Sequence, residues 1–303
     1  MINLNYPDLI KELKKDKDVL ILSHYYVHGA VQDIADYVGD SYYLSQMALQ
    51  SKAQTILFCG VKFMAESAKI LSPSKTVLMP DEEADCPMAH MITPHEIEQV
   101  RKQYHDLAVV CYINSTSEIK ALSDVCVTSA NAVTIVRNLK QKNIFFVPDK
   151  NLGKYVQSQV PDKNFIFNNG FCCVHANITK EDLAKTLRDV PNAEIVAHPE
   201  CTPDVLEMAT FIGSTSNILD YVSRSTHTEF IICTEVGIFH QLIKNNPGKR
   251  FYISSDRQLC ANMKKITLEN VYKALVTLTP EINLDKDIIK KAKGSLQMMH
   301  TLA

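Results

Sequence analysis

Three cysteines recur at matching points of the 303-residue chain and could together bind a metal centre. Cys86, Cys172 and Cys260 lie 86 and 88 positions apart. Cysteine thiolates hold iron–sulfur clusters, and a 4Fe–4S cluster with three such ligands keeps one iron free to act as a Lewis acid. Zinc is the alternative if His175 supplies a fourth ligand. Spacing alone also allows the adjacent Cys173 to replace Cys172.

Polar residues that could bind and transform a substrate follow three apolar segments, VLILSHYY, LAVVCYIN and AEIVAHPE. They occur in three sets, which are His24, Tyr112 and His198; Tyr26, Asn114 and Glu200 two positions later; and Ser41, Ser129 and Thr215 seventeen positions after the first set. Histidine, glutamate and tyrosine are common proton-transfer groups. Hydroxyls at helix starts, as expected for the third set and Ser214, suit phosphate or carboxylate, because a helix N-terminus offers free N–H groups.

These residues recur because the chain repeats one arrangement of helices and strands three times, in units of about 87 residues. Within each unit, three apolar strand-like runs alternate with helical stretches, which is typical of parallel sheets covered on both faces. Seven positions after each of the three cysteines, a threonine is expected to cap a helix (Thr93, Thr179 and Thr267). The predicted fold is therefore α/β, with three small parallel-sheet domains related by a pseudo-threefold axis.

The predicted domains are residues 1–90 together with C-terminal helices in 267–303, then residues 91–176, then residues 177–266. The last helix, within IIKKAKGSLQMMHTLA, lies outside the repeat and is expected to pack on the first domain. Ligands of open parallel sheets bind beyond the carboxyl ends of the strands. The cluster and the active site are therefore predicted at the centre, where the three domains meet.

Composition limits the possible partners and the location of the chain. A net charge of −2 gives no reason to expect a nucleic-acid or membrane partner. With nine glycines and neither GxGxxG nor GxxxxGK, the chain lacks the common nucleotide-binding loops. The start MINLNYPDLIKELKKDKDV has no apolar leader, so we expect a cytoplasmic protein, whose cysteines are poor candidates for disulfides.

Longer motifs along nearly the whole chain resemble those of the quinolinate synthase family. They include SHYYVHGAVQDIADYVGDS, KTVLMPDEEADCPMAHM, GFCCVH, HPECTPDVLEMATFIGSTSNI and CANMKKIT. The resemblance implies a transferase of NAD biosynthesis that condenses iminoaspartate with dihydroxyacetone phosphate, giving quinolinate, phosphate and two waters. It also implies three α/β domains, one 4Fe–4S cluster with three Cys ligands and one open iron, and an upstream aspartate oxidase or dehydrogenase.

The same motifs imply roles for individual residues. The cluster ligands are Cys86, Cys172 and Cys260, because the family's CxxH spacing to His175 fits Cys172 and not Cys173. The implied substrate-binding residues are His24, Ser41, Tyr112, Asn114, Ser129, His198, Glu200, Ser214 and Thr215, and the implied catalytic residues are Tyr26, Glu200, His198 and His175. The chain departs from the family pattern at His90, Asn168, Asn169, Cys173 and Ala261, none of which is a proposed ligand or catalytic group.

Three other hypotheses fit the same residues. Another 4Fe–4S hydro-lyase would act on a different hydroxy acid and would not consume dihydroxyacetone phosphate. A cluster-based redox sensor would need a nucleic-acid or protein partner, usually with a basic patch or a helix-turn-helix, and neither is evident in this sequence. A zinc-binding scaffold without activity would be recognised by metal analysis.

Overall fold

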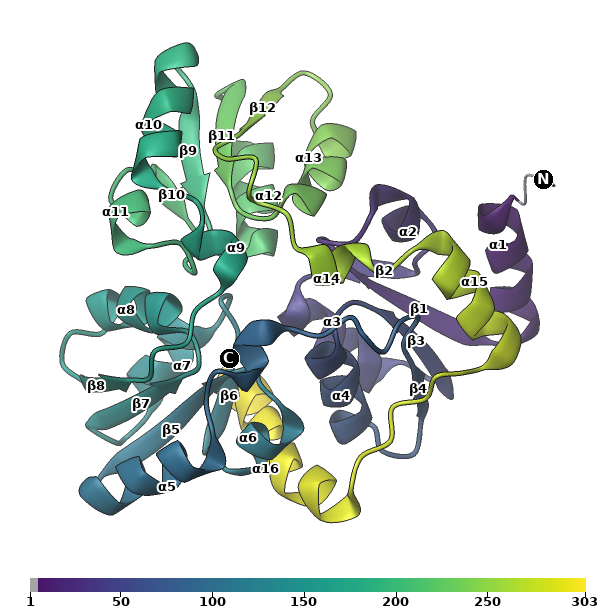
Figure 1. Ribbon diagram of the computed structural model, residues 1–303, viewed down its shortest axis with the longest axis horizontal. Coiled ribbons are helices and arrows are strands. Elements are labelled where there is room, and N and C mark those ends of the chain that lie inside the picture. Colours follow the sequence, from purple (N-terminus) through teal and green to yellow (C-terminus); the bar gives the residue numbers. More distant parts are fainter. Residues whose placement is uncertain (1–4) are drawn as a thin grey trace.

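A computed structural model describes residues 5–303, which form three α/β units, each built on a four-stranded parallel sheet (Figure 1). The strand orders are β2-β1-β3-β4, β6-β5-β7-β8 and β10-β9-β11-β12, so the three sheets have the same topology. The predicted α/β fold with three parallel-sheet domains is confirmed. Figure 1 shows the sheets arranged around a common centre, whereas a threefold rotation that relates them stays a prediction.

The first unit contains the N-terminal helix and the first sheet, and residues 1–4 of the predicted first domain lie outside the described part. Its elements are α1 (Tyr6–Asp16), β1 (Val19–His24), α2 (Gly29–Asp33), β2 (Tyr37–Gly39), α3 (Ser41–Gln50), β3 (Thr55–Cys59), α4 (Lys62–Leu71), β4 (Thr76–Leu78) and the 3-10 turn η1 (Pro87–His90). Most residues of β1 and β3 are buried, because helices cover both faces of a parallel sheet.

The second unit repeats this order of elements. They are α5 (Pro94–Gln103), β5 (Leu107–Tyr112), α6 (Ser117–Ala121), β6 (Val125–Val127), α7 (Ala132–Asn138), β7 (Asn143–Val147), α8 (Lys150–Gln159), β8 (Asn164–Phe167) and α9 (Cys173–Ala176). All six residues of β5 are buried, which explains why its sequence LAVVCY is continuously apolar and does not alternate.

The third unit differs only in that its fourth helix is preceded by a 3-10 turn. Its elements are α10 (Lys180–Asp189), β9 (Glu194–Ala197), α11 (Pro203–Leu206), β10 (Phe211–Ile212), α12 (Thr215–Arg224), β11 (Glu229–Cys233), η2 (Val236–Ile238), α13 (Phe239–Asn245), β12 (Arg250–Ile253) and α14 (Ala261–Lys264). Two further helices, α15 (Leu268–Thr277) and α16 (Lys286–Leu302), follow the last repeat.

Each unit has four strands, whereas the sequence pattern predicted three. The additional strands are β2, β6 and β10, which pair with β1, β5 and β9. They contain three, three and two residues, so they are too short for an apolar periodicity to reveal them. Each lies just before the predicted hydroxyl position and directs the chain back toward the centre of the molecule.

The predicted helix caps are confirmed. The side chains of Thr93, Thr179 and Thr267 accept the N–H three residues later at the starts of α5, α10 and α15. At Thr93 the Glu96 side chain also binds the Thr93 backbone N–H, which completes a capping box. The helix that follows each cysteine turn therefore begins at the same number of residues after that cysteine.

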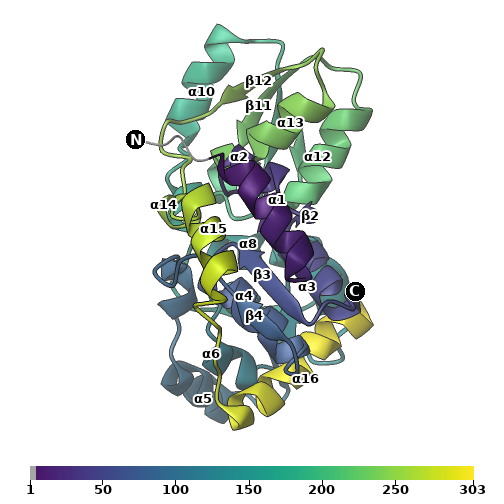
Figure 2. The ribbon, with the colours of Figure 1, turned by 90° about the vertical axis from the view of Figure 1, so that its right-hand side faces the viewer.

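The last two helices pack on the first two units, and α16 connects them. Helix α15 packs against α1 and β3, and Figure 2 shows it beside α1. Helix α16 contacts α6 and β6 of the second unit as well as α4 of the first, so the expectation that it packs on the first domain describes only part of its position. Its buried residues Ala292, Leu296 and Met299 belong to one apolar core that runs through both units. Among the described residues, no helix combines the length and apolar character required to cross a membrane.

Candidate active site

A cavity lies where the three units meet, and the residues identified from the sequence line it. Its lining includes His24, Tyr26, Ser41, Tyr112, Asn114, Ser129, His175, His198, Glu200, Thr215 and the three cysteines Cys86, Cys172 and Cys260. Among the predicted site residues only Ser214 is missing from this lining. The cavity therefore draws side chains from all three repeats.

The ends of parallel strands direct these residues inward. Strand β1 ends at His24, β5 ends at Tyr112, and His198 directly follows β9. Ser41 and Thr215 are the first residues of α3 and α12. The sheets thus present their carboxyl ends to one space, as open parallel sheets do at ligand sites.

Ser214 has a different environment from its neighbour Thr215. It is fully buried and caps α12, with its Oγ accepting the Asn217 backbone N–H at 3.3 Å and bonding to the Asn217 side chain at 2.9 Å. Its Oγ also lies 3.3 Å from Asp40 Oδ2. The proposed contact of Ser214 with substrate stays a prediction, and the observed contacts are those of a helix cap.

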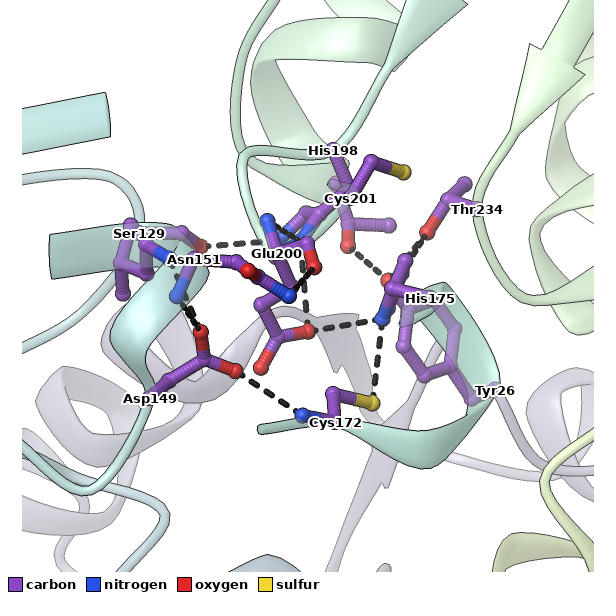
Figure 3. Close-up of polar contacts among 12 residues, drawn as sticks. Tyr26, Ser129, Asp149, Asn151, Cys172, His175, His198, Glu200, Cys201 and Thr234 are labelled. Atoms are coloured by element: carbon purple, nitrogen blue, oxygen red, sulfur yellow. Dashed lines mark hydrogen bonds and ion pairs between the residues drawn. The ribbon is translucent and has the colours of Figure 1, made fainter. Parts of the chain in front are cut away.

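A chain of hydrogen bonds runs along the cavity wall from the first unit to Glu200 (Figure 3). Tyr26 Oη lies 2.8 Å from Thr215 Oγ1 and 2.7 Å from Thr234 Oγ1. Thr234 Oγ1 lies 2.8 Å from His175 Nε2, and His175 Nδ1 lies 2.9 Å from Glu200 Oε2. Tyr26 comes close to Thr234 because the adjacent Gly237 has no Cβ; a Cβ there would lie 2.6 Å from the Tyr26 Cα.

The chain continues beyond Glu200 into the second unit. His198 Nδ1 lies 3.3 Å from Glu200 Oε2, and His198 Nε2 lies 3.1 Å from Ser129 Oγ. The rings of His175 and His198 stack with centroids 4.7 Å apart. Glu200 is only 3% exposed, and its second oxygen, Oε1, has no hydrogen-bond partner in the described part of the chain. This carboxylate therefore has one oxygen bonded to the His175 imidazole and close to that of His198, and one oxygen available to a ligand.

Burial sets the protonation states of the surrounding groups. It lowers the pKa of His24 to about 4 and lowers the pKa of His198. Burial also acts to raise the pKa of Glu200, but His175 and His198 more than offset this and hold that pKa below its ordinary value. The pKa of Tyr26 is raised well above its ordinary value by burial. Near neutral pH, Glu200 is consequently a carboxylate and Tyr26 is a neutral phenol.

The buried His24 should make the folded chain sensitive to acid. Its pKa is about 4 in the folded state against 6.5 as the ordinary value, so below pH 6.5 the unfolded chain takes up the proton first. His24 should thus cause no loss of stability above pH 6.5 and a loss of roughly 3 kcal/mol as pH falls to 4. Urea unfolding of the metal-free protein at pH 7 and pH 4 measures this loss.

A His24→Asn variant tests the assignment. The Asn Oδ1 can still accept the Tyr26 backbone N–H that His24 Nδ1 accepts at 3.1 Å, but the residue does not titrate. The difference in stability between pH 7 and pH 4 should shrink in this variant and stay unchanged when the exposed His95 is replaced by Asn. An equal difference in wild type and His24→Asn would assign the acid sensitivity to other groups.

The three predicted cysteine ligands occupy equivalent positions, each immediately before a short helical turn. Cys86 precedes η1, Cys172 precedes α9 and Cys260 precedes α14. Burial raises the pKa of all three thiols, and backbone N–H groups of these turns act in the opposite direction. The charge of Cys260 also raises the pKa of Cys86, and the charge of Cys86 raises that of Cys172. All three cysteines line the same cavity.

These features fit a cluster held by three thiolates. All three cysteines are free, partly buried and on the wall of one cavity. The buried Asn114 Oδ1 and Glu200 Oε1, which line the same cavity, have no partner among the described residues. Such polar atoms are expected to face a ligand or another polar group.

A second arrangement of ligands is also present. Among the described residues, one group could hold a single ion, because Cys172, His175 and Glu200 offer ligand atoms that lie within 4.8 Å of one another. This group contains neither Cys86 nor Cys260. It is a single-ion site that differs from the zinc alternative of the sequence analysis, in which the three cysteines and His175 together would hold the metal.

Comparison with known proteins identifies the family of the chain. The family described as "Quinolinate synthetase A protein" matches residues 8–301. The chain belongs to this family. Among its relatives, a quinolinate synthase of Fusobacterium nucleatum is 53% identical over 98% of this chain and 99% of its own length, and one of Clostridium perfringens strain SM101 is 50% identical over 97% and 98%. A quinolinate synthase of Caldicellulosiruptor saccharolyticus is 48% identical over 97% of both chains. The resemblance inferred from the motifs is thus confirmed.

Some residues of this site were not predicted from the sequence. Asp40 and Glu235 line the cavity, and Thr234 links Tyr26 to His175. Thr234 shares its repeat position with Gly60 and Pro148, so the alignment of the repeats could have drawn attention to it. Asp40 directly precedes Ser41 and caps α3 by accepting the Tyr43 backbone N–H.

Proposed function

We propose that this protein is a quinolinate synthase, a transferase of NAD biosynthesis that condenses iminoaspartate with dihydroxyacetone phosphate to give quinolinate, phosphate and two waters. The main support is one cavity that combines three thiols from three units with a carboxylate held between two imidazoles. The names of its full-length relatives agree with this activity.

In this proposal Cys86, Cys172 and Cys260 hold one 4Fe–4S cluster. When bound, the cluster supplies one iron without a protein ligand, a Lewis acid that polarises substrate oxygens and makes hydroxide a better leaving group. The cluster ligands are thiolates, so cluster binding must overcome the raised pKa values of these thiols. The three thiols lie partly buried on the wall of the cavity in which the substrate would bind.

Substrate anions bind at the hydroxyls and helix starts of the cavity. Ser41 and Thr215 begin the ten-residue helices α3 and α12, whose N-terminal N–H groups and dipoles favour phosphate and carboxylate. Ser129 adds a hydroxyl from the second unit. His24 is neutral at pH 7, and its Nδ1 accepts a backbone N–H, so its Nε2 carries the proton and can donate to a carboxylate.

The polar groups of the second unit orient the remaining substrate atoms. Asn114 Oδ1 is buried without a partner among the described residues, so it can accept from an imine N–H or a hydroxyl. Burial raises the pKa of Tyr112 well above its ordinary value, so its phenol stays neutral and can donate a hydrogen bond. Ser214 of the third unit, which the sequence placed among the substrate-binding residues, would act through the cap of α12.

Proton transfer is assigned to Glu200 and the groups bonded to it. The unpartnered Oε1 of Glu200 accepts a proton from a substrate carbon or hydroxyl, while Oε2 stays bonded to His175 and His198. His175 can pass a proton through Thr234 toward Tyr26, since these groups form a continuous chain. The raised pKa of Tyr26 makes it a donor to a departing hydroxyl or a positioning group, not a base at neutral pH.

An anaerobic assay with reconstituted protein tests the proposal. Iminoaspartate is generated in the tube by an aspartate oxidase, which represents the proposed upstream partner, and dihydroxyacetone phosphate is added. We expect quinolinate and inorganic phosphate in equal amounts, with neither formed when dihydroxyacetone phosphate is omitted. Iron-loaded protein that leaves dihydroxyacetone phosphate unchanged but dehydrates another hydroxy acid would support the hydro-lyase alternative.

A further inference from the structure

Each cysteine turn is tied to the junction between the third strand of its sheet and the helix that follows. The backbone N–H groups of Lys62, Lys150 and Val236 donate to the carbonyls of Ala84, Gly170 and Gln258, at 2.8, 2.9 and 2.9 Å. In every unit the accepting residue lies two positions before the cysteine. The three turns are thus anchored by one repeated backbone contact.

In the second unit, a buried carboxylate adds a contact to the cysteine itself. Asp149 Oδ2 accepts the Cys172 backbone N–H at 3.0 Å, while Oδ1 accepts the N–H groups of Asn151 and Leu152 at 2.8 Å each. The same side chain therefore caps α8 and holds the cysteine turn. The close approach also depends on Gly170, because a Cβ there would collide with the carbonyl oxygen of Pro148.

The third unit has the equivalent carboxylate at the matching position. Glu235 Oε1 accepts the Cys260 backbone N–H at 3.0 Å, and Oε2 accepts the Gly237 N–H at 2.6 Å. Lys264 Nζ lies 2.8 Å from Glu235 Oε1. Asp149 and Glu235 lie one residue after the repeat-equivalent Pro148 and Thr234, so the correspondence follows from the repeat.

In the first unit, a carboxylate at a different position accepts the cysteine N–H. Val61 stands at the equivalent position, and its side chain cannot accept a hydrogen bond. Instead Asp85 Oδ1 accepts the Cys86 N–H at 2.7 Å, and its Oδ2 lies 2.8 Å from His90 Nε2. All three cysteine N–H groups therefore bond to a carboxylate.

Capping alone does not explain why Asp149 and Glu235 are buried. Both are 0% exposed, and a carboxylate is costly to bury unless its oxygens accept several hydrogen bonds. Asp285 caps α16 through the same two positions, accepting the N–H groups of Asp287 and Ile288, and it does so on the surface. The additional feature of the buried pair is the bond to a cysteine turn.

We propose that Asp149 and Glu235 are positioning residues that hold the turns of Cys172 and Cys260 in the orientation needed for metal binding. Each carboxylate fixes the N–H of one cysteine, so that the thiol faces the cavity whether or not metal is present. The consequence for metal retention rests on the proposed cluster, whereas the effect on the turns does not. Residues that orient metal ligands in this way typically change metal affinity when they are replaced.

Amide hydrogen exchange of the full-length protein, read by mass spectrometry, tests the proposal. In Asp149→Asn the single acceptor oxygen can still serve the two helix N–H groups, but the amide group then faces the Cys172 N–H. Exchange in the segment of Cys172 should become roughly tenfold faster, with the segment of Cys260 unchanged. Glu235→Met, which has no oxygen to accept the Cys260 N–H, should accelerate exchange in the segment of Cys260 and leave that of Cys172 unchanged. The matched cap variant Asp285→Asn should change neither segment.

Iron release from the anaerobically loaded protein to a ferrous chelator gives the second measurement. Each of the two buried-site variants should lose iron roughly tenfold faster than wild type and Asp285→Asn. Equal acceleration of exchange at both cysteine segments in either variant, or no acceleration, would overturn the proposal. If Asp149→Asn does not fold, Glu235→Met decides the question alone. Wild-type protein that binds no iron would refute the proposed function, and hydrogen exchange would still test the positioning role.

Discussion

Replacing Glu200 with glutamine is expected to lower the kcat of quinolinate formation by roughly 10²- to 10⁴-fold, the usual contribution of a general acid or base. Glutamine preserves the shape of the side chain and can still bond to His175 and His198. It removes the negative charge, so the oxygen that has no protein partner can no longer take up a substrate proton at neutral pH. The measurement is steady-state kinetics on protein with wild-type iron content.

A second glutamate provides a matched control. Glu66 is also largely buried and accepts a hydrogen bond from Ser117 Oγ at 2.7 Å, but it does not line the cavity. Glu66→Gln should keep kcat within about twofold of wild type, because exchanges of this kind away from reacting groups leave the barrier nearly unchanged. A Glu200→Gln variant as active as Glu66→Gln would restrict Glu200 to holding the two histidines in place.

The repeat explains why so much of the fold was predictable. Cysteines, strand-end residues and capping threonines each kept their position in all three units, so three weak signals supported one another. The alignment of the repeats also predicted the central cavity, because equivalent strand ends of three sheets meet at one place. Strands β2, β6 and β10 were missed since two or three residues carry too little periodicity to be recognised.

The hydrogen-bond chain of the site was less accessible from the sequence. Thr234 lies 208 positions from Tyr26 and 59 positions from His175 along the chain, and nothing local indicates that a threonine will bridge them. The distinction between Ser214 and Thr215 also required the structure. Adjacent hydroxyls at a helix start differ in direction, and here the first one caps the helix while the second faces the cavity.

Single alanine variants of Cys86, Cys172 and Cys260 are each expected to remove most of the bound iron and sulfide and to abolish activity. A cluster attached by only two thiolates is held too weakly to survive purification, whereas about four iron and four sulfide per chain are expected in wild type. Iron, sulfide and zinc analysis after anaerobic purification measures the effect. Cys173→Ala is the matched control, because this exposed neighbour of Cys172 belongs to the turn but is not a proposed ligand.

The variants of Cys86 and Cys260 distinguish a cluster from a single-ion site. A single ion bound by Cys172, His175 and Glu200 would be lost in Cys172→Ala but retained in Cys86→Ala and Cys260→Ala, since neither residue belongs to that group. One zinc per chain with this pattern of loss would therefore refute the cluster and favour the single-ion site. Loss of iron in all three variants, with full retention in Cys173→Ala, requires a centre that contacts all three units, because each ligand follows a different sheet.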